Sequence, residues 1–299
     1  MKIGIAGTGR MGVAIGARLL DQGHELHVWN RSAARTKPLT DTGAKLAATP
    51  AELAARCEAL ITILTDSAAI DAVYQGRDGL LSGNVAGKLF IEMSTVPAAT
   101  QCALAPAVAA KGAAVVECPV GGSVGPAREG KLIGFIGGSA ADAARARPIV
   151  EQLCRRVEHV GPTGAGAAMK LAINLPLAVY WQAFGEALSL VQGLGIEPDR
   201  LVSIFADTSA GPNMLKPMGP GIVQALKGDL TGTVMFDVDS VRKDLRTMLE
   251  EARAQGKPLP IVTRALEVFN EASGEGWGPR NCSTLPAYWL ARGTKFREH

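Results

Sequence analysis

Three glycines near the amino terminus constrain the fold of this chain more than any other feature. Gly7, Gly9 and Gly12 follow an apolar run at 3–6 and open a helical pattern that continues to Leu20. In this G-x-G-x-x-G spacing the first glycine allows a tight turn, the second lets the backbone approach a pyrophosphate, and the third lets the helix pack on the strand. The N–H groups at the helix start then face the phosphates, so we expect a dinucleotide-binding βαβ unit. The residues expected around the phosphates are Gly7, Thr8, Gly9, Arg10, Met11 and Gly12.

The end of the expected second strand indicates which dinucleotide is bound. An NAD site usually carries Asp or Glu at this position, to hold the ribose 2′-hydroxyl. This chain has Asn30 there, followed by Arg31 and Ser32, with Arg35 one turn further on. A carboxylate would repel a 2′-phosphate, whereas an amide, a guanidinium group and a hydroxyl can all hydrogen-bond to one. NADP is therefore the predicted cofactor, with NAD as a weaker alternative.

Length and composition exclude several classes of protein. The chain has 299 residues, enough for two domains, and its net charge of +3 is too small to indicate binding to nucleic acid or to an acidic membrane. No uninterrupted apolar stretch reaches membrane-spanning length, and the first strand begins too early for a signal peptide to precede it. The five cysteines lie singly, without a C-x-x-C pair. We therefore expect a cytoplasmic protein without disulfides and without a metal site.

The order of apolar runs predicts an α/β domain followed by an all-helical one. In the first half, short apolar runs alternate with helical segments, which is typical of βαβ units and a mostly parallel sheet. After the first two strands, the runs expected to form strands are 60–64, 89–93, 114–117, 132–136 and 157–160. We expect a Rossmann dinucleotide-binding domain over 1–163 and an all-α substrate and oligomerisation domain over 164–299. The second would be built around a long interdomain helix, 164–193, kinked at Pro176. Further helices are expected at 198–206, 240–254 and 260–272.

A lysine and an asparagine near the start of the long helix are the best candidates for acid–base chemistry. Lys170 and Asn174 lie four residues apart, which places them on one helical face, one turn apart. The neighbouring residues are apolar and the domain boundary is close, so burial would favour the neutral amine and suit the lysine to acid–base catalysis. A solvated structural lysine is the alternative, and the residues leave both open. The histidines are poorly placed for this role; they are His24, His27, His159 and His299.

A glycine-rich segment after a further apolar strand is a candidate for binding substrate. Residues 117–127 read Glu-Cys-Pro-Val-Gly-Gly-Ser-Val-Gly-Pro-Ala. A strand that ends in Gly121, Gly122 and Ser123 offers backbone N–H groups and a hydroxyl, which together suit a carboxylate. A simple flexible turn is the alternative.

Taken together, these motifs resemble one family over almost the whole chain. The chain looks like a β-hydroxyacid dehydrogenase, the group that contains 3-hydroxyisobutyrate dehydrogenase and tartronate semialdehyde reductase and is related to 6-phosphogluconate dehydrogenase. The matching segments are the glycine motif ending in Met11-Gly12, the segment 117–123 for D-x-P-V-S-G-G, the segment 164–174 for G-x-G-x-x-x-K followed by asparagine, and Lys243-Asp244-Leu245 after Phe236.

The resemblance implies a function and a set of site residues. It implies an oxidoreductase that interconverts a small, carboxylate-bearing aldehyde with a β-hydroxy acid by hydride transfer. Lys170 would be the catalytic acid/base and Asn174 its substrate-binding companion, with Lys243 beside both substrate and nicotinamide. Thr95 would lie near the nicotinamide ribose, and Leu64 and Thr65 would line the cofactor cleft. The resemblance also implies a homodimer or homotetramer.

The chain departs from the family pattern at three positions. The first acid of the substrate motif is Glu117 rather than Asp, the hydroxyl of Ser-Gly-Gly has moved two places to Ser123, and Ile173 replaces the first asparagine of the catalytic motif. These changes put the substrate in doubt. Four large aromatic residues could line a less polar pocket, with a place in the core as the alternative; they are Trp181, Phe205, Trp277 and Trp289. Two alternatives remain: an imine reductase, whose family usually lacks the lysine, and a non-catalytic NADP-binding module.

Overall fold

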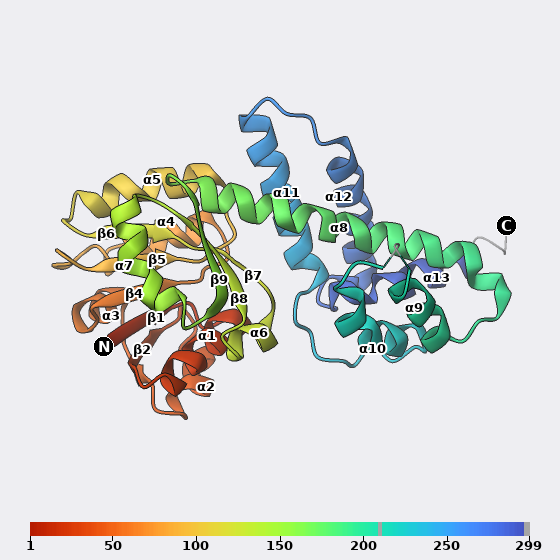
Figure 1. Cartoon of the computed structure of the whole chain (residues 1–299), viewed down its shortest axis with the longest axis horizontal. Helices are drawn as coiled ribbons and strands as arrows, with labels where there is room; N and C mark the ends of the chain where they lie inside the picture. Colours follow the sequence, from red (N-terminus) through yellow and green to blue (C-terminus); the bar gives the residue numbers. More distant parts are fainter. Residues whose placement is uncertain (209–210, 296–299) are drawn as a thin grey trace. The chain divides into compact units, whose positions relative to one another are not determined.

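The computed structural model describes residues 1–208 and 211–295 (Figure 1). The chain forms two compact units, Met1–Ile173 and Asn174–His299. Across the described residues, none of the helices is both long and apolar enough to cross a membrane.

The first unit is built on one twisted sheet, all of whose residues are described. Its strands are β1 (Lys2–Ala6), β2 (Glu25–Trp29), β3 (Lys45–Leu46), β4 (Ala59–Thr62), β5 (Leu89–Glu92), β6 (Ala114–Glu117), β7 (Val120–Gly121), β8 (Leu132–Gly137) and β9 (Cys154–Gly161). The spatial order is β3-β2-β1-β4-β5-β6-β8-β7, with β9 paired to β8. Strands β1 to β6 pair in parallel, while β8 is antiparallel to β6 and β7. The predicted Rossmann fold is confirmed; the sequence did not indicate β3 and β7, which are two residues long.

Helices cover both faces of this sheet because both faces are apolar. They are α1 (Arg10–Asp21), α2 (Lys37–Thr40), α3 (Pro50–Arg56), α4 (Ser67–Gln75), α5 (Ala98–Ala109), α6 (Val124–Arg128) and α7 (Ala140–Val150), with a short 3₁₀ turn at Ala33–Thr36. Ile61 and Ile91 point into a core shared with α1 and α7, whereas Leu60 and Phe90 point into a second core shared with α3, α4 and α5. This alternation along β4 and β5 follows the two-residue period of a strand.

Helix α8 (Ala165–Val191) begins in the first unit and continues into the second. The predicted boundary after Thr163 lies at the start of α8, whereas the two units divide within it, between Ile173 and Asn174. The first turn of α8 belongs to the first unit because it is hydrogen-bonded to Glu117 at the end of β6. Pro176 lies inside α8 and does not end it.

The described residues of the second unit are helical apart from loops and an isolated bridge between Asp237 and Asn281. After α8 come a 3₁₀ turn (Gln192–Leu194), α9 (Pro198–Ala206), α10 (Leu215–Leu226), α11 (Val238–Ala254), α12 (Pro260–Ala272), a π-helical segment (Ser273–Trp277), a 3₁₀ turn (Cys282–Thr284) and α13 (Leu285–Lys295). The predicted all-α second domain is confirmed. Its core is aromatic in part, with Trp181 and Phe184 of α8, Phe269 of α12 and Tyr288 of α13 all buried.

Candidate active site

The geometry of the glycine loop matches what a bound pyrophosphate requires. Gly7 has a φ of +103°, and a Cβ there would overlap the carbonyl oxygen of Ile63. A Cβ at Gly12 would overlap the carbonyl oxygen of Gly7, so the glycine lets α1 start tight against the loop. By contrast, a Cβ at Gly9 would have no neighbour within 4 Å. Gly9 is also the N-cap of α1 and makes no side-chain capping bond. The N–H groups at the start of a helix suit phosphate oxygens.

Asn30 ties the glycine loop to the chain beyond β2. Its Oδ1 accepts a hydrogen bond from the Thr8 N–H at 3.1 Å, and its Nδ2 donates to the carbonyl oxygen of Ser32 at 3.0 Å. Both ends of the amide are thus engaged with backbone, which is a role the sequence did not reveal. Asn30 organises the loop, while Arg31 and Ser32, the other two residues predicted to contact a 2′-phosphate, are exposed.

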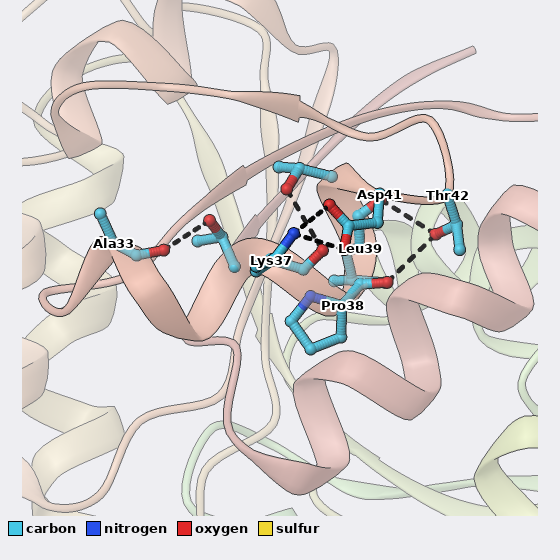
Figure 2. A network of polar contacts seen from close by, with 8 residues as sticks. Ala33, Lys37, Pro38, Leu39, Asp41 and Thr42 are labelled. Carbon is cyan, nitrogen blue, oxygen red and sulfur yellow. Dashed lines mark hydrogen bonds and ion pairs between the residues drawn. The ribbon is translucent and has the colours of Figure 1, made fainter.

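The segment after Ser32 is a compact turn held by its own polar groups (Figure 2). Thr36 Oγ1 donates to the carbonyl oxygen of Ala33 at 2.7 Å, and Lys37 Nζ pairs with both carboxylate oxygens of Asp41, the nearer at 2.8 Å. Thr42 Oγ1 donates back to the carbonyl oxygen of Leu39 at 2.9 Å. Arg35 lies exposed within this turn, and Arg31 lies exposed just before it.

A buried carboxyl network fixes the loops that follow β4 and β5. Glu92 is fully buried at the end of β5, and its Oε1 accepts hydrogen bonds from the backbone N–H of Ser94 at 3.0 Å and from Thr62 Oγ1. Ser94 Oγ also donates to Glu92 and accepts from the Leu64 N–H at 2.7 Å, and Gln101 donates to the other oxygen. Burial raises the pKa of Glu92 to about 7. The network joins the two loops that carry the predicted cofactor residues: Leu64, Thr65 and Thr95.

Sequence reasoning missed this role of Glu92. The only signal is an acid that ends an otherwise apolar strand and is followed by serine. Of the residues on the two loops, Leu64 and Thr95 are half-buried and Thr65 is exposed.

Glu117 caps the start of helix α8 although the two are far apart in the sequence. This side chain, at the end of β6, is 1% exposed. One carboxylate oxygen accepts hydrogen bonds from the N–H groups of Gly164 and of Gly166, the latter at 3.0 Å, and the other accepts from the Ala167 N–H at 3.0 Å. The acid that the sequence places at the head of the substrate motif therefore binds the protein's own helix.

The glycine-rich loop after Glu117 has one position that only glycine suits and one that is less restricted. Gly122 has a φ of +123°, and a Cβ there would lie 2.7 Å from the side chain of Leu132. Gly121 has no such restriction, because a Cβ would lie 3.6 Å from the ring of Phe135. Ser123 is half-buried at the N-cap position of α6, where its side chain makes no capping bond.

The three polar residues predicted around the reacting end of the substrate are divided between the two units. Lys170 is half-buried on α8, within the first unit. In the second unit, Asn174 Nδ2 donates to Asp244 Oδ2 at 3.1 Å, and Lys243 Nζ lies 2.7 Å from Asp244 Oδ1. Asp244 is 4% exposed, so this carboxylate is a buried bridge that holds Asn174 and Lys243 together. The sequence showed Asp244 only as the middle residue of Lys-Asp-Leu. His299, one of the four histidines, lies outside the described residues.

A small, mostly apolar pocket adjoins this bridge within the second unit. Its lining comes from α8, α11 and the loop before α11: Asn174, Leu177, Ala178, Trp181, Phe236, Val241, Asp244 and Met248. Trp181 lines this pocket and is also fully buried in the core, so it fits both expectations for the large aromatic residues. Phe205 instead packs edge-on against Phe184, and Trp277 against Tyr288.

Comparisons with known proteins agree over both units. Residues 2–161 match the family described as the NAD binding domain of 6-phosphogluconate dehydrogenase, and residues 164–288 match the NAD-binding family of NADP-dependent 3-hydroxyisobutyrate dehydrogenase. Glyoxylate/succinic semialdehyde reductase 1 of Arabidopsis thaliana is 32% identical over 95% of this chain and 97% of that protein. The 3-hydroxyisobutyrate dehydrogenase of Pseudomonas aeruginosa is 33% identical over 90% of this chain and 91% of its own length. A crystal structure of 3-hydroxyisobutyrate dehydrogenase from Salmonella typhimurium superposes with a TM-score of 0.84 at 26% identity, covering 96% of this chain and 99% of that one.

Proposed function

The chain belongs to the β-hydroxyacid dehydrogenase family of NAD(P)-dependent oxidoreductases, which interconvert small aldehydes and β-hydroxy acids, and we propose the residues, cofactor preference and substrate class through which it acts. The cofactor is NADP(H), the substrate is a small aldehyde that carries a carboxylate, and Lys170 is the general acid. The observation that carries this proposal is the half-buried Lys170, on the helix whose start is fixed by Glu117, one turn before Asn174.

Proton transfer is the part of the reaction that the protein supplies. When bound, the nicotinamide supplies the hydride that goes to the carbonyl carbon. The ammonium group of Lys170 donates a hydrogen bond to the carbonyl oxygen and gives it a proton as negative charge develops there. In the oxidation direction the neutral amine accepts that proton from the hydroxyl group. Asn174 uses one amide N–H on Asp244 and keeps its Oδ1 for a substrate hydroxyl.

The preference for NADP(H) rests on the exposed residues after β2. Arg31 and Ser32 supply a guanidinium fork and a hydroxyl, and no acid competes with a 2′-phosphate at the end of this strand. The description of the second matching family as NADP-dependent supports the same choice.

The carboxylate of the substrate is assigned to the loop after β7. Gly122 allows close backbone approach, and Ser123 offers a hydroxyl that makes no capping bond. The relative from Arabidopsis thaliana is named for glyoxylate and succinic semialdehyde, which are both small aldehydes with a carboxylate.

Assembly and location form part of the proposal. Several large apolar side chains of the second unit are strongly exposed, among them Leu190 at 88%, Leu194 at 67% and Ile261 at 65%. A homodimer or homotetramer that contacts through this unit would cover them. All five cysteines are free thiols, which supports a reducing, cytoplasmic location.

A parallel assay tests the proposal against its rivals. Purified protein is given small aldehydes with and without a carboxylate, each with NADPH and NADH, and the same carbonyl compounds with an added amine. We expect NADPH-dependent reduction of the acid-bearing aldehydes. Activity that requires the amine would favour an imine reductase, and NADPH binding without turnover of any compound would favour a non-catalytic module.

A further inference from the structure

The side chain of Glu117 connects the sheet of the first unit to the helix that carries Lys170. It leaves the end of β6, is almost completely buried, and accepts hydrogen bonds from three backbone N–H groups at the start of α8: those of Gly164, Gly166 and Ala167. These are among the N–H groups that a helix start leaves without an intrahelical partner. No residue close in sequence provides this cap, since Glu117 lies 47 positions before Gly164.

Two glycines leave the space that this contact needs. Gly137 of β8 is paired with Glu117 across the sheet, and a Cβ there would overlap the carboxylate. A Cβ at Gly166 would press on the carbonyl oxygen of Phe135 in β8 and lie 3.2 Å from the side chain of Glu117. At Gly166 the first turn of α8 thus lies too close to β8 for a side chain to fit between them. Because of this packing, a shift of the carboxylate is transmitted to the helix.

The carboxylate also matches the helix electrostatically. Aligned peptide dipoles give the start of a long helix a partial positive charge, and a carboxylate there is favourable, more so when it is buried. α8 is 27 residues long. An amide in place of the carboxylate would lose the charge and would turn an N–H₂ group toward one of the N–H donors.

We propose that Glu117 is a positioning residue for the reaction, which fixes the start of α8 and thereby places the ammonium group of Lys170 against the reacting carbonyl. Lys170 follows the last of the three donors, Ala167, by three residues, less than one helical turn. This inference rests on the proposed function, because it assumes that Lys170 is the general acid. Glu117 thus acts on the position of Lys170, although it belongs to the segment 117–123, which is expected to bind substrate.

The substrate loop has supports of its own. Val120 and Gly121 of β7 pair with Gly134 and Ile133 of β8, so that β7 keeps its place without the carboxylate. Removing the Glu117 carboxylate should therefore lower kcat by displacing Lys170, and should leave substrate binding nearly unchanged.

The experiment is a double-mutant cycle between Glu117→Gln and Lys170→Ala. For each single variant and the double variant, kcat and KM for the best aldehyde, the Kd for NADPH and the thermal midpoint are measured. Gly137→Ala displaces the carboxylate without removing it and serves as a second, independent variant. Ser139→Ala removes the N-cap of α7, whose hydroxyl accepts from the Asp142 N–H, and is the matched control for the loss of a helix cap.

We expect Glu117→Gln to lower kcat by roughly 10- to 100-fold, as misplacing a catalytic group by about 1 Å does, with KM and the Kd for NADPH nearly unchanged. Gly137→Ala should act in the same direction, and Ser139→Ala should keep full kcat. In the Lys170→Ala background Glu117→Gln should have no further effect on kcat, because both act through one group.

Other outcomes would overturn the inference in distinguishable ways. Full kcat in folded Glu117→Gln, or multiplicative losses in the double variant, would show that Glu117 does not act through the lysine. An equal loss of kcat in Ser139→Ala would show that the effect of Glu117 is only a general contribution of helix capping to stability. If Lys170→Ala itself keeps full activity, the proposed function fails instead.

Discussion

The cofactor preference can be tested at a single exposed side chain, Arg31. Replacing it with alanine removes the guanidinium group expected to contact the 2′-phosphate. A hydrogen bond to a charged group contributes about 1.5–3 kcal/mol. Arg31 is exposed, and fixing its flexible side chain costs entropy, so the lower end of this range applies. Since about 1.4 kcal/mol corresponds to a tenfold change in affinity, the Kd for NADPH should rise about tenfold.

The Kd for NADH is the internal reference, because NADH lacks the 2′-phosphate and should bind the variant as it binds the parent. Lys37→Ala is the matched control: it removes a cation from the same turn, but one already paired with Asp41 (Figure 2). It should change neither Kd appreciably. Titration of each protein with both cofactors decides the matter. An equal change in the two Kd values for Arg31→Ala, or no change in either, would refute the assignment.

The remaining predictions concern cofactor loop, substrate, assembly and pH. Asn30→Asp keeps the acceptor for Thr8 but sets a carboxylate against the Ser32 carbonyl and the 2′-phosphate, so titration should show the NADPH preference reduced or reversed; an unchanged preference would exclude this. Ser123→Ala should raise KM for an acid-bearing aldehyde by the factor that corresponds to a loss of about 0.5–3 kcal/mol in binding free energy. The rise should be much smaller for an uncharged aldehyde of similar size, and an unchanged KM for every acid would contradict the prediction. Sedimentation at micromolar concentration should show a dimer or tetramer that Leu190→Asp weakens, and a monomeric parent protein would contradict this. The folded-state pKa of Glu92, about 7, is raised above its ordinary value of 4.5, so its contribution to stability is complete below pH 4.5 and is lost as pH rises toward 7. Glu92→Gln should flatten the slope of unfolding free energy in that window, and an unchanged slope would count against it.

Secondary structure was predictable where the local pattern is strong. Helices α9 and α12 begin at Pro198 and Pro260, which suit the first turn of a helix, and their expected bounds match the structure. The two-residue strands β3 and β7 were missed because so short a segment shows no alternation. The units divide inside α8, after its first turns, because Glu117 attaches that end to the sheet, and nothing near residue 173 in the sequence indicates this.

The candidate site was predictable where a residue's role is local. The roles of Gly7 and Gly12 follow from their spacing, and the structure shows the same close contacts. Contacts between distant residues were not predictable: Asp244 lies 70 positions from Asn174. Such pairs form only when strands and helices pack together, which the local sequence does not show. The residue type gives little help, because a single acid at the end of a strand or within a helix is compatible with many roles.

The most direct test of the central claim, that Lys170 is the general acid, is the turnover of Lys170→Ala beside its binding of NADPH. Truncating the side chain should lower kcat for aldehyde reduction by about 10² or more, the usual contribution of a positioned acid, while the Kd for NADPH stays nearly unchanged. Met169→Ala, on the same turn and 40% exposed, is the matched control and should keep full activity. A Lys170→Ala protein that binds NADPH and reduces the best aldehyde at nearly the parent rate would contradict the mechanism.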